Sequence, residues 1–150
     1  MAKSDGITDR ILHELSRDGR LSNIELADRV GLSPSACLRR VQELEKTGLI
    51  KGYRAILDRD QLGQGFTVYV MVGLSDHSKA SQERFESAMR TAPEVTECHN
   101  VSGVFEYLLR VEVPDLAAYK TFHTDKLGQV PNVNAINSYM VMGSPKNMRG

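Results

Sequence analysis

The stretch LSNIELADRVGLSPSACLRRVQELEKTGLIKGY, residues 21–53, predicts two short helices joined by a tight turn. Ser22 can cap the first helix, and Glu25, three residues later, completes a capping box. Gly31 supplies a left-handed stop, after which the pair Ser33–Pro34 opens a second helix. Two helices joined this closely cross at a steep angle, which is the arrangement that inserts a helix into the major groove of DNA.

The second helix of this stretch has an apolar face and a polar face. Cys37, Val41 and Leu44 repeat at helical spacing and are expected in the core. Donor-rich side chains on the opposite face can contact base edges or phosphates, and arginine can bind guanine with two parallel hydrogen bonds. A merely solvated face is the alternative, but the capped helix pair favours DNA contact. The candidate DNA-binding residues are Ser33, Ser35, Ala36, Arg39, Arg40, Gln42 and Lys46.

Composition limits the classes of protein to which the chain can belong. It has 150 residues, 41% of them hydrophobic and 25% charged, which is typical of a globular protein of one or two small domains. Its 19 basic and 19 acidic residues balance, so DNA affinity must come from local arrangement. A local excess of positive charge lies between Arg29 and Arg54, a stretch that contains six basic residues and two acidic ones.

Several other classes are not supported by the sequence. The chain has no apolar run long enough to span a bilayer and MAKSDGITDR lacks a signal-peptide core, so we expect a cytoplasmic protein without a membrane partner. Cys37 and Cys98 are expected to be reduced thiols. The histidines are scattered, and Cys98 and His99 point to opposite sides of a strand, so no metal site is expected. Neither a nucleophile motif nor a phosphate loop is present, so we expect no catalytic residues and no cofactor.

The rest of the chain predicts two domains. A first helix is expected after Asp5, and a short strand or wing over residues 49–57. Residues 58–65, DRDQLGQG, have two glycines and no apolar pattern, which is typical of a hinge. The predicted organisation is therefore a DNA-binding domain over 1–57, the hinge, and a second domain over 66–150.

The second domain alternates strands and helices. Its apolar patterns predict strands over 66–74, 95–101, 105–113 and 133–142, with helices over 78–92 and from Asp115 onward. This order is the ferredoxin-like βαββαβ motif, with both helices on one face of the sheet, so the fold class is α+β.

The other face of this sheet is expected to be apolar and to pair with a second copy of the chain. A twofold dimer would favour a pseudo-palindromic DNA site with half-sites about one helical turn apart, or a multiple of it. A register slip of one residue would exchange the two faces. The candidates for the helix-free face are Tyr69, Met71, Cys98, Leu108, Tyr139 and Val141.

Taken together, the helix pair and the second domain resemble the Lrp/AsnC, or feast/famine, family of bacterial and archaeal regulators, and the leucine-responsive branch most. The resemblance covers nearly the whole chain. It implies a transcription regulator with a winged-helix-like DNA-binding domain and a RAM- or ACT-like domain that forms dimers and commonly octamers of four dimers. The segments that carry it are Asp18–Arg20, NxxELAxRVGLSPSxCLRRVxxLE over 23–45, Gly48–Tyr53, Glu97–His99, Val101–Gly103, Tyr107–Leu109 and Val113–Asp115.

The resemblance also implies a small effector, usually an amino acid, at the interface between dimers. Backbone N–H groups near Gly103 could bind its carboxylate, and Glu106 or Asp115 its ammonium. The chain has Val104 and Glu106 where related members often have Asp, which leaves open a different ligand or none. The implied effector residues are Val101, Ser102, Gly103, Val104, Phe105, Glu106, Tyr107, Asp115, Tyr139, Met140 and Val141.

Three alternatives stay open at this point. The loop around Gly103 could be a plain hairpin turn, since glycine is common in such turns. The protein could be a ligand-independent architectural protein of the nucleoid that bends or wraps DNA. It could also be an amino-acid-sensing subunit of an enzyme, although that reading leaves the helix pair unexplained.

Overall fold

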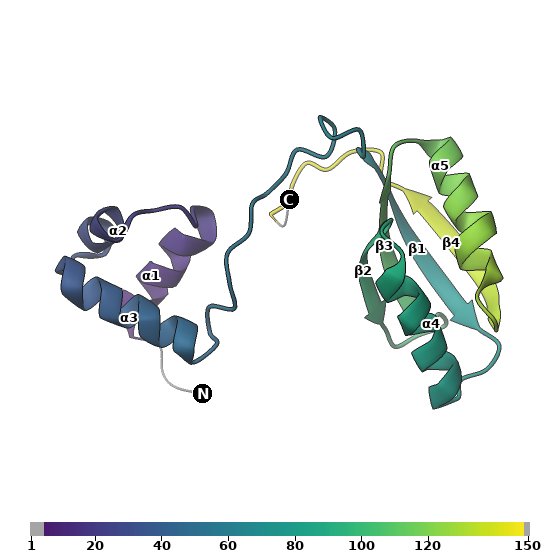
Figure 1. The fold of residues 1–150 in the computed structure, drawn as a ribbon, viewed down its shortest axis with the longest axis horizontal. Coiled ribbons are helices and arrows are strands. Elements are labelled where there is room, and N and C mark those ends of the chain that lie inside the picture. Colours follow the sequence, from purple (N-terminus) through teal and green to yellow (C-terminus); the bar gives the residue numbers. More distant parts are fainter. Residues whose placement is uncertain (1–4, 149–150) are drawn as a thin grey trace. The chain divides into compact units, whose positions relative to one another are not determined.

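The chain forms two compact units in a computed structural model that describes residues 5–148 (Figure 1). The first unit ends at Ala55. Residues 58–65, expected as a hinge, belong to the second unit. They form a turn from which the Arg59 Nε lies 3.1 Å from Glu112 Oε2, so this segment is anchored to the sheet that follows it.

The first unit is a bundle of three helices, as the capping signals predict. Its core contains Ile11, Leu26, Val30 and Cys37, all nearly or fully inaccessible to solvent. A unit this small buries little apolar surface, so its well-capped helix ends contribute a large share of its order. The helices are α1 (Gly6–Arg17), α2 (Asn23–Val30) and α3 (Pro34–Lys46).

The segment after α3 does not form the predicted strand. A short strand or wing was expected over 49–57; the described part of the chain has no strand between α3 and residue 66, so the strand was wrong. A strand needs a neighbouring strand to satisfy its backbone groups, and none is present here. The segment instead folds back as far as Tyr53, whose hydroxyl donates to Glu45 Oε1 at 2.9 Å and whose ring lies against Gly19.

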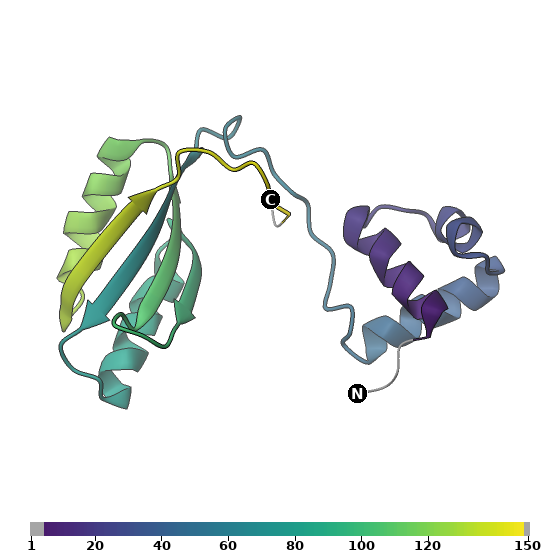
Figure 2. The same ribbon diagram turned by 180° about the vertical axis from the view of Figure 1, so that it is seen from behind.

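The second unit is a four-stranded antiparallel sheet in the order β2-β3-β1-β4. Helices α4 and α5 cover one face, and the view from behind shows the other face without a helix (Figure 2). This confirms the ferredoxin-like prediction. Strands β2, β3 and β4 are one or two residues shorter than expected. The elements are β1 (Phe66–Leu74), α4 (Lys79–Thr91), β2 (Val95–Asn100), β3 (Tyr107–Val113), α5 (Leu116–Thr121) with the turns η1 (Phe122–Lys126) and η2 (Leu127–Gln129), and β4 (Val133–Met140). Within residues 5–148, no helix has the length and apolar character needed to cross a membrane.

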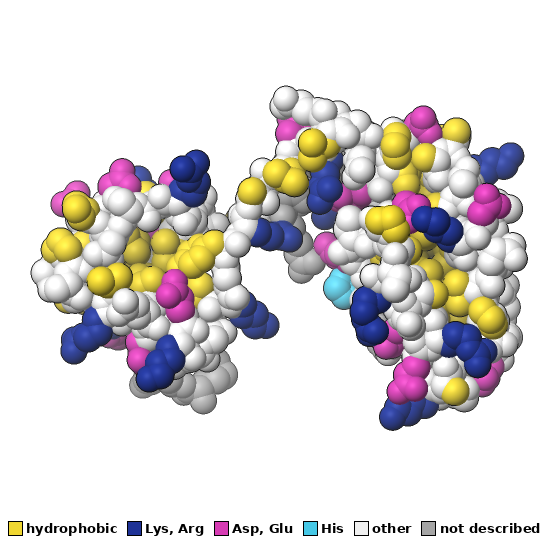
Figure 3. Space-filling view, in the orientation of Figure 1, with side chains coloured by type: hydrophobic (Ala, Val, Ile, Leu, Met, Phe, Trp, Pro, Cys, Tyr) yellow, Lys and Arg dark blue, Asp and Glu magenta, His cyan; other side chains and the backbone are white. Residues whose placement is uncertain are grey.

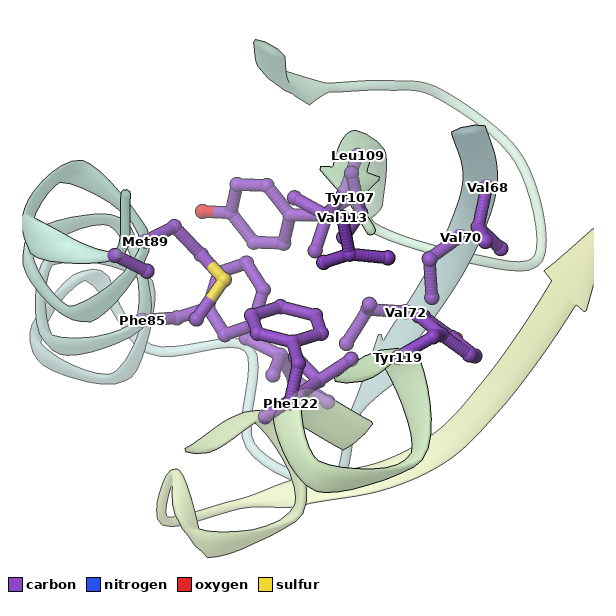
Figure 4. Close-up of a cluster of buried hydrophobic side chains, with 14 residues drawn as sticks. Val68, Val70, Val72, Phe85, Met89, Tyr107, Leu109, Val113, Tyr119 and Phe122 are labelled. Carbon is purple, nitrogen blue, oxygen red and sulfur yellow. The ribbon is translucent and has the colours of Figure 1, made fainter. Parts of the chain in front are cut away.

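The core of the second unit lies between the sheet and its two helices. Phe85 and Met89 of α4 pack on the valines of β1 and on Tyr107 of β3 (Figure 4). The rings of Phe85 and Tyr107 are 4.5 Å apart at their centroids. From α5 and η1, Tyr119 and Phe122 close the other side of this core.

The helix-free face differs from the prediction in two ways. Cys98 lies opposite Leu109 and packs on the core side, because a bulge between Val95 and Glu97 shifts the register of β2. The face is also not uniformly apolar. Tyr69, Met71, Leu108 and Tyr139 lie on it as expected, but by register Glu97, His99, Arg110 and Glu112 share it.

The charged residues of this face form a connected network. Arg110 Nη2 lies 2.9 Å from Glu112 Oε1, and Arg110 Nη1 lies 3.6 Å from Glu97 Oε1. His99 Nε2 is 3.0 Å from Glu97 Oε2. Because the side chain of Glu112 is only 3% exposed, its two arginine partners are needed to offset the cost of burying its charge.

Candidate functional site

The helix pair of the first unit has both of its predicted caps. The Ser22 hydroxyl accepts from the Glu25 N–H at 3.2 Å, and Glu25 Oε2 accepts from the Ser22 N–H at 2.9 Å, which completes the capping box. Gly31 has φ +73°, the left-handed conformation that suits glycine. Ser33 accepts from the Ala36 N–H at 3.3 Å and so caps α3. These caps define where α3 begins and thereby place its outer face.

Asn23 is a positioning residue that sequence reasoning missed. Its side-chain amide donates to the Pro34 carbonyl oxygen at 2.8 Å, which connects the first turn of α2 to the first turn of α3. The hydrogen bond spans 11 positions of the chain, so no local pattern could indicate it. It helps to fix the crossing of the two helices, on which any approach of α3 to DNA depends.

The outer face of α3 carries most of the predicted DNA-binding residues. Ser35, Arg39, Gln42 and Lys46 are all exposed and follow one another at helical spacing. Within residues 5–148, neither Arg39 nor Lys46 takes part in an ion pair. Of the others, Ser33 serves as the cap and Ala36 is half-buried at the first turn.

Arg40 is the exception among these candidates. Its Nη1 lies 2.6 Å from Asp5 Oδ2 and 3.3 Å from the Thr8 hydroxyl, so it connects α3 to the first turn of α1. The backbone hydrogen bond from Thr8, followed by that from Arg40, lowers the pKa of Asp5 from 3.8 to about 2. The structure therefore places Arg40 in the packing of α3 on α1, apart from the outer stripe.

The charge around α3 is smaller than the sequence count indicates. Arg29 lies 2.9 Å from Glu14 Oε2, which lowers the pKa of that carboxyl, and Arg40 is balanced by Asp5. Figure 3 shows the Lys and Arg side chains of that view spread among Asp and Glu side chains on both units. The outer face of α3 thus offers a few placed donors, which suits contact with specific DNA groups more than bulk attraction.

The loop predicted to bind an effector is a well-defined turn between β2 and β3. The Val101 N–H donates to the Glu106 carbonyl oxygen at 2.8 Å, and the Glu106 N–H donates to the Val72 carbonyl oxygen at 3.0 Å. Gly103 has φ +134°, and apart from its chain neighbours no atom of residues 5–148 lies within 4 Å of where its Cβ would be. Val104 is 90% exposed. The tip of the loop is therefore open and its base is fixed.

The Glu106 carboxylate is already engaged inside the chain. One of its oxygens accepts from the Leu74 N–H at 2.8 Å, and the other lies 2.8 Å from Nδ1 of His77. An ammonium group could reach Glu106 only by sharing it with His77 or replacing it. Sequence reasoning missed His77 because it lies 29 positions before Glu106, and only the fold brings them together.

The remaining predicted effector residues lie at the other end of the sheet. Met140 is opposite Val68, whereas the loop joins β3 at Tyr107, which is opposite Val72. Asp115 caps α5 by accepting from the Ala118 N–H at 2.8 Å. One chain therefore does not bring these residues together with the loop. The exposed residues at this far end are Asp115, Tyr139 and Met140, with Val141 partly exposed.

Tyr107 closes the loop side of the core. Its ring is fully buried, and its hydroxyl donates to Glu86 Oε1 at 2.8 Å. Burial, followed by Glu86, raises the pKa of Tyr107. Phe105 is half-buried beside Gly73, and Ser102 is exposed. Among residues 5–148, no three His, Cys, Asp or Glu side chains gather in a way that could hold a metal ion.

The two units match two family models. Residues 5–51 match the model described as "Winged helix-turn-helix DNA-binding", and residues 67–150 match "Lrp/AsnC ligand binding domain". The leucine-responsive regulatory proteins of Klebsiella pneumoniae and Escherichia coli K12 are each 44% identical to this chain over 142 residues, covering 95% of it and 87% of the relative.

Solved structures agree over both units. The transcriptional regulator NMB0573 of Neisseria meningitidis, in complex with L-Met, matches with a TM-score of 0.92 at 34% identity, over 95% of this chain and 92% of that one. An AsnC family regulator of Agrobacterium tumefaciens matches with a TM-score of 0.91 at 34% identity, over 97% and 95%. The feast or famine regulatory protein of M. tuberculosis, complexed with L-methionine, matches with a TM-score of 0.83 at 29% identity, over 97% of both chains. With a capped helix pair that presents donors and a ferredoxin-like second unit, the chain belongs to the Lrp/AsnC family of DNA-binding transcription regulators.

Proposed function

We propose that this regulator controls genes of amino-acid metabolism and that the outer face of α3 contacts DNA bases. The observation that carries the proposal is the exposed stripe of Ser35, Arg39, Gln42 and Lys46 on a helix whose start is fixed by Ser33. Side chains in the first half of such a helix contact base edges when the helix lies in the major groove. A regulator of this kind acts on the bacterial or archaeal nucleoid, in the cytoplasm.

We further propose that the helix-free face of the sheet pairs two chains. Tyr69 and Tyr139 lie side by side there and are 38% and 56% exposed. Aromatic side chains of this kind are enriched at protein interfaces. A twofold dimer would present two copies of α3 to half-sites about one helical turn apart on a pseudo-palindromic site. Four such dimers would form the octamer.

The effector in this proposal is an amino acid held between chains. The loop 101–106 of one chain would supply backbone donors near Gly103, and residues Asp115 and 139–141 would come from another chain. Two structural neighbours, from N. meningitidis and M. tuberculosis, were solved with L-methionine. In this chain the ammonium of the amino acid would replace His77 as the partner of the Glu106 carboxylate. The Glu106 side chain lies at the base of the loop and is 17% exposed.

The competing function is an architectural protein that binds DNA without an effector. The engaged state of Glu106 and the Val104 side chain at the loop tip favour this alternative. The enzyme-subunit alternative is dropped, because the relatives are transcription regulators.

A binding-site selection on random duplexes, run with and without a panel of amino acids, separates the two remaining functions. An enriched site whose occupancy changes with one amino acid supports the regulator, whereas an effector-insensitive site supports the architectural protein.

The effector loop can be tested by one matched pair of variants. Gly103→Asp places a side chain on a backbone with φ +134°, which side chains rarely adopt, and should abolish the amino-acid response while the DNA site is still bound. Gly143→Asp adds the same charge at an open glycine with an ordinary φ and should leave the response unchanged. An intact response in the Gly103 variant would place the effector elsewhere.

A further inference from the structure

A cavity of about 280 Å³ lies at the edge of the sheet, between α4 and β2. Glu86, Met89 and Arg90 of α4 form one wall, and β2, with Cys98 and Asn100, forms another. Its volume is near the lower limit for small-molecule sites, so it suits a ligand of a few heavy atoms more than a nucleotide. Only Tyr107 is shared with the residues proposed above for the effector.

Glu86 and Arg90 line this cavity without forming an ion pair with each other, whereas Glu97, which also lines it, is paired with His99 and Arg110. Glu86 and Arg90 are one turn apart on α4, a spacing at which such residues commonly pair. Neither takes part in an ion pair with any residue between 5 and 148. The Glu86 carboxylate is instead held by the Tyr107 hydroxyl at 2.8 Å. The N–H donors of the Arg90 guanidinium are therefore not used in an ion pair within residues 5–148, and the Glu86 carboxylate one helical turn away is held in place by Tyr107.

Tyr107 gives Glu86 a fixed position. Its ring packs against Phe85 in the core, with the oxygen directed toward α4 (Figure 4). A phenol fixed in this way can hold one carboxylate oxygen and leave the other free to accept from a ligand.

The lining of the cavity is partly polar and partly apolar, and its apolar part includes Val95 and two sulfur-containing side chains. Met89 is 2% exposed and Cys98 is half-buried. Burial, followed by the charge of Glu86, raises the pKa of the Cys98 thiol to about 11, with Arg90 acting in the opposite direction. The charges of Glu86 and Arg90 therefore both influence the electrostatic potential next to the Cys98 sulfur. The thiol stays neutral near pH 7 and behaves as a small apolar surface.

We propose that this cavity binds the zwitterion of a small α-amino acid inside a single chain. The Arg90 guanidinium binds the carboxylate with two hydrogen bonds, Glu86 accepts from the ammonium, and an aliphatic or thioether side chain packs on Met89 and Cys98. This is a second site, separate from the loop of the proposed function, and its occupation requires neither DNA nor a second chain.

Calorimetric titration of the full chain with L-methionine tests the assignment. Arg90→Gln and Glu86→Gln should each weaken one class of sites by about tenfold or more, since each removes a charge from a hydrogen-bonded ion pair. Glu86→Gln keeps an acceptor for Tyr107, so it preserves the fold. Arg84→Gln removes an exposed charge of α4 away from the cavity and is the matched control. Equal titrations for the Arg90 and Arg84 variants would overturn the proposal.

Two further measurements locate the ligand. L-methionine should slow maleimide labelling of Cys98 in the unmodified chain, and Arg90→Gln should remove this protection; peptide mass mapping distinguishes Cys98 from the buried Cys37. N-acetyl-L-methionine and L-methioninamide, which each lack one of the two charges of the amino acid, should protect Cys98 poorly.

An absence of protection by L-methionine would rule out the cavity. If Gly103→Asp removes all binding heat and Arg90→Gln removes none, the loop is the site and the cavity is not. Loss of DNA binding would count against the proposed function alone.

Discussion

Replacing Arg39 by alanine should reduce both the affinity and the sequence selectivity of DNA binding. Arg39 is five residues after Pro34, which places it about 7.5 Å from the start of α3, and Lys46 is about 10.5 Å further on at 1.5 Å per residue. The major groove is about 12 Å wide. With Arg39 at a base edge, Lys46 therefore reaches the phosphates at the groove wall. The two side chains should have different effects.

The expected magnitudes follow from these positions. Loss of a two-bond contact between arginine and guanine costs about 1 to 3 kcal/mol per DNA-reading unit, or about 5- to 150-fold in affinity. Lys46→Ala should instead weaken binding to all sequences evenly and reduce the slope of log affinity against log salt by about 0.9, the value for one phosphate.

Fluorescence anisotropy on the selected site and on a scrambled duplex measures both effects. The titrations should cover about 50 to 200 mM salt, where phosphate contacts have their largest influence. Arg84→Ala, in the second unit, removes an equal charge and serves as control. If Arg39→Ala binds both duplexes as the unmodified chain does, Arg39 contacts neither base nor phosphate and the outer face of α3 is not the reading surface.

Three predictions concern the stability of the first unit. Ser22→Ala removes the cap of α2 and should lower the free energy of unfolding by about 1 kcal/mol in urea titrations, and an unchanged midpoint would contradict the cap. Gly31→Ala should cost about 1 to 2 kcal/mol in the same assay, entirely from its positive φ, since nothing lies within 4 Å of the new Cβ. Asp5 has its pKa lowered to about 2 by the Thr8 N–H and then by Arg40, so its stabilisation is present above its ordinary pKa of 3.8 and is lost as the pH falls toward 2. Asp5→Asn should therefore unfold more readily than the unmodified chain at pH 5, and thermal melts should show the difference shrinking as the pH falls through about 2.

Local signals in the sequence were sufficient for the helix ends and the order of elements. The capping box at Ser22, the stop at Gly31 and the cap at Ser33 each depend on residues within four positions of one another. A continuous apolar run likewise predicted β1, alternating apolar residues predicted β3, and the order of elements indicated the ferredoxin-like motif. Such features could be predicted because the interacting groups are close to one another in the sequence.

Contacts between distant segments could not be predicted in this way. Arg40 was placed with the DNA-binding residues, although Asp5, 35 positions earlier, engages it. Cys98 was placed on the helix-free face because the pattern of β2 does not show its bulge. Likewise, His77 has no sequence feature that connects it with Glu106. In each case the deciding partner lies in another element, and only the three-dimensional fold determines that it is near.

The division of the proposed effector residues between two ends of the sheet has a thermodynamic consequence. The loop joins β3 at Tyr107, and Asp115 follows the other end of this strand, about 20 Å away at 3.4 Å per residue. A small amino acid cannot bridge that distance, so a site that uses both groups must form between chains. The ligand of such a site binds only the assembled protein. By thermodynamic linkage, the free energy by which the ligand stabilises the assembly equals the free energy by which assembly improves ligand binding. A cavity inside one chain, such as that beside Arg90, has no such linkage. The dependence of effector affinity on protein concentration therefore distinguishes the two sites without any substitution.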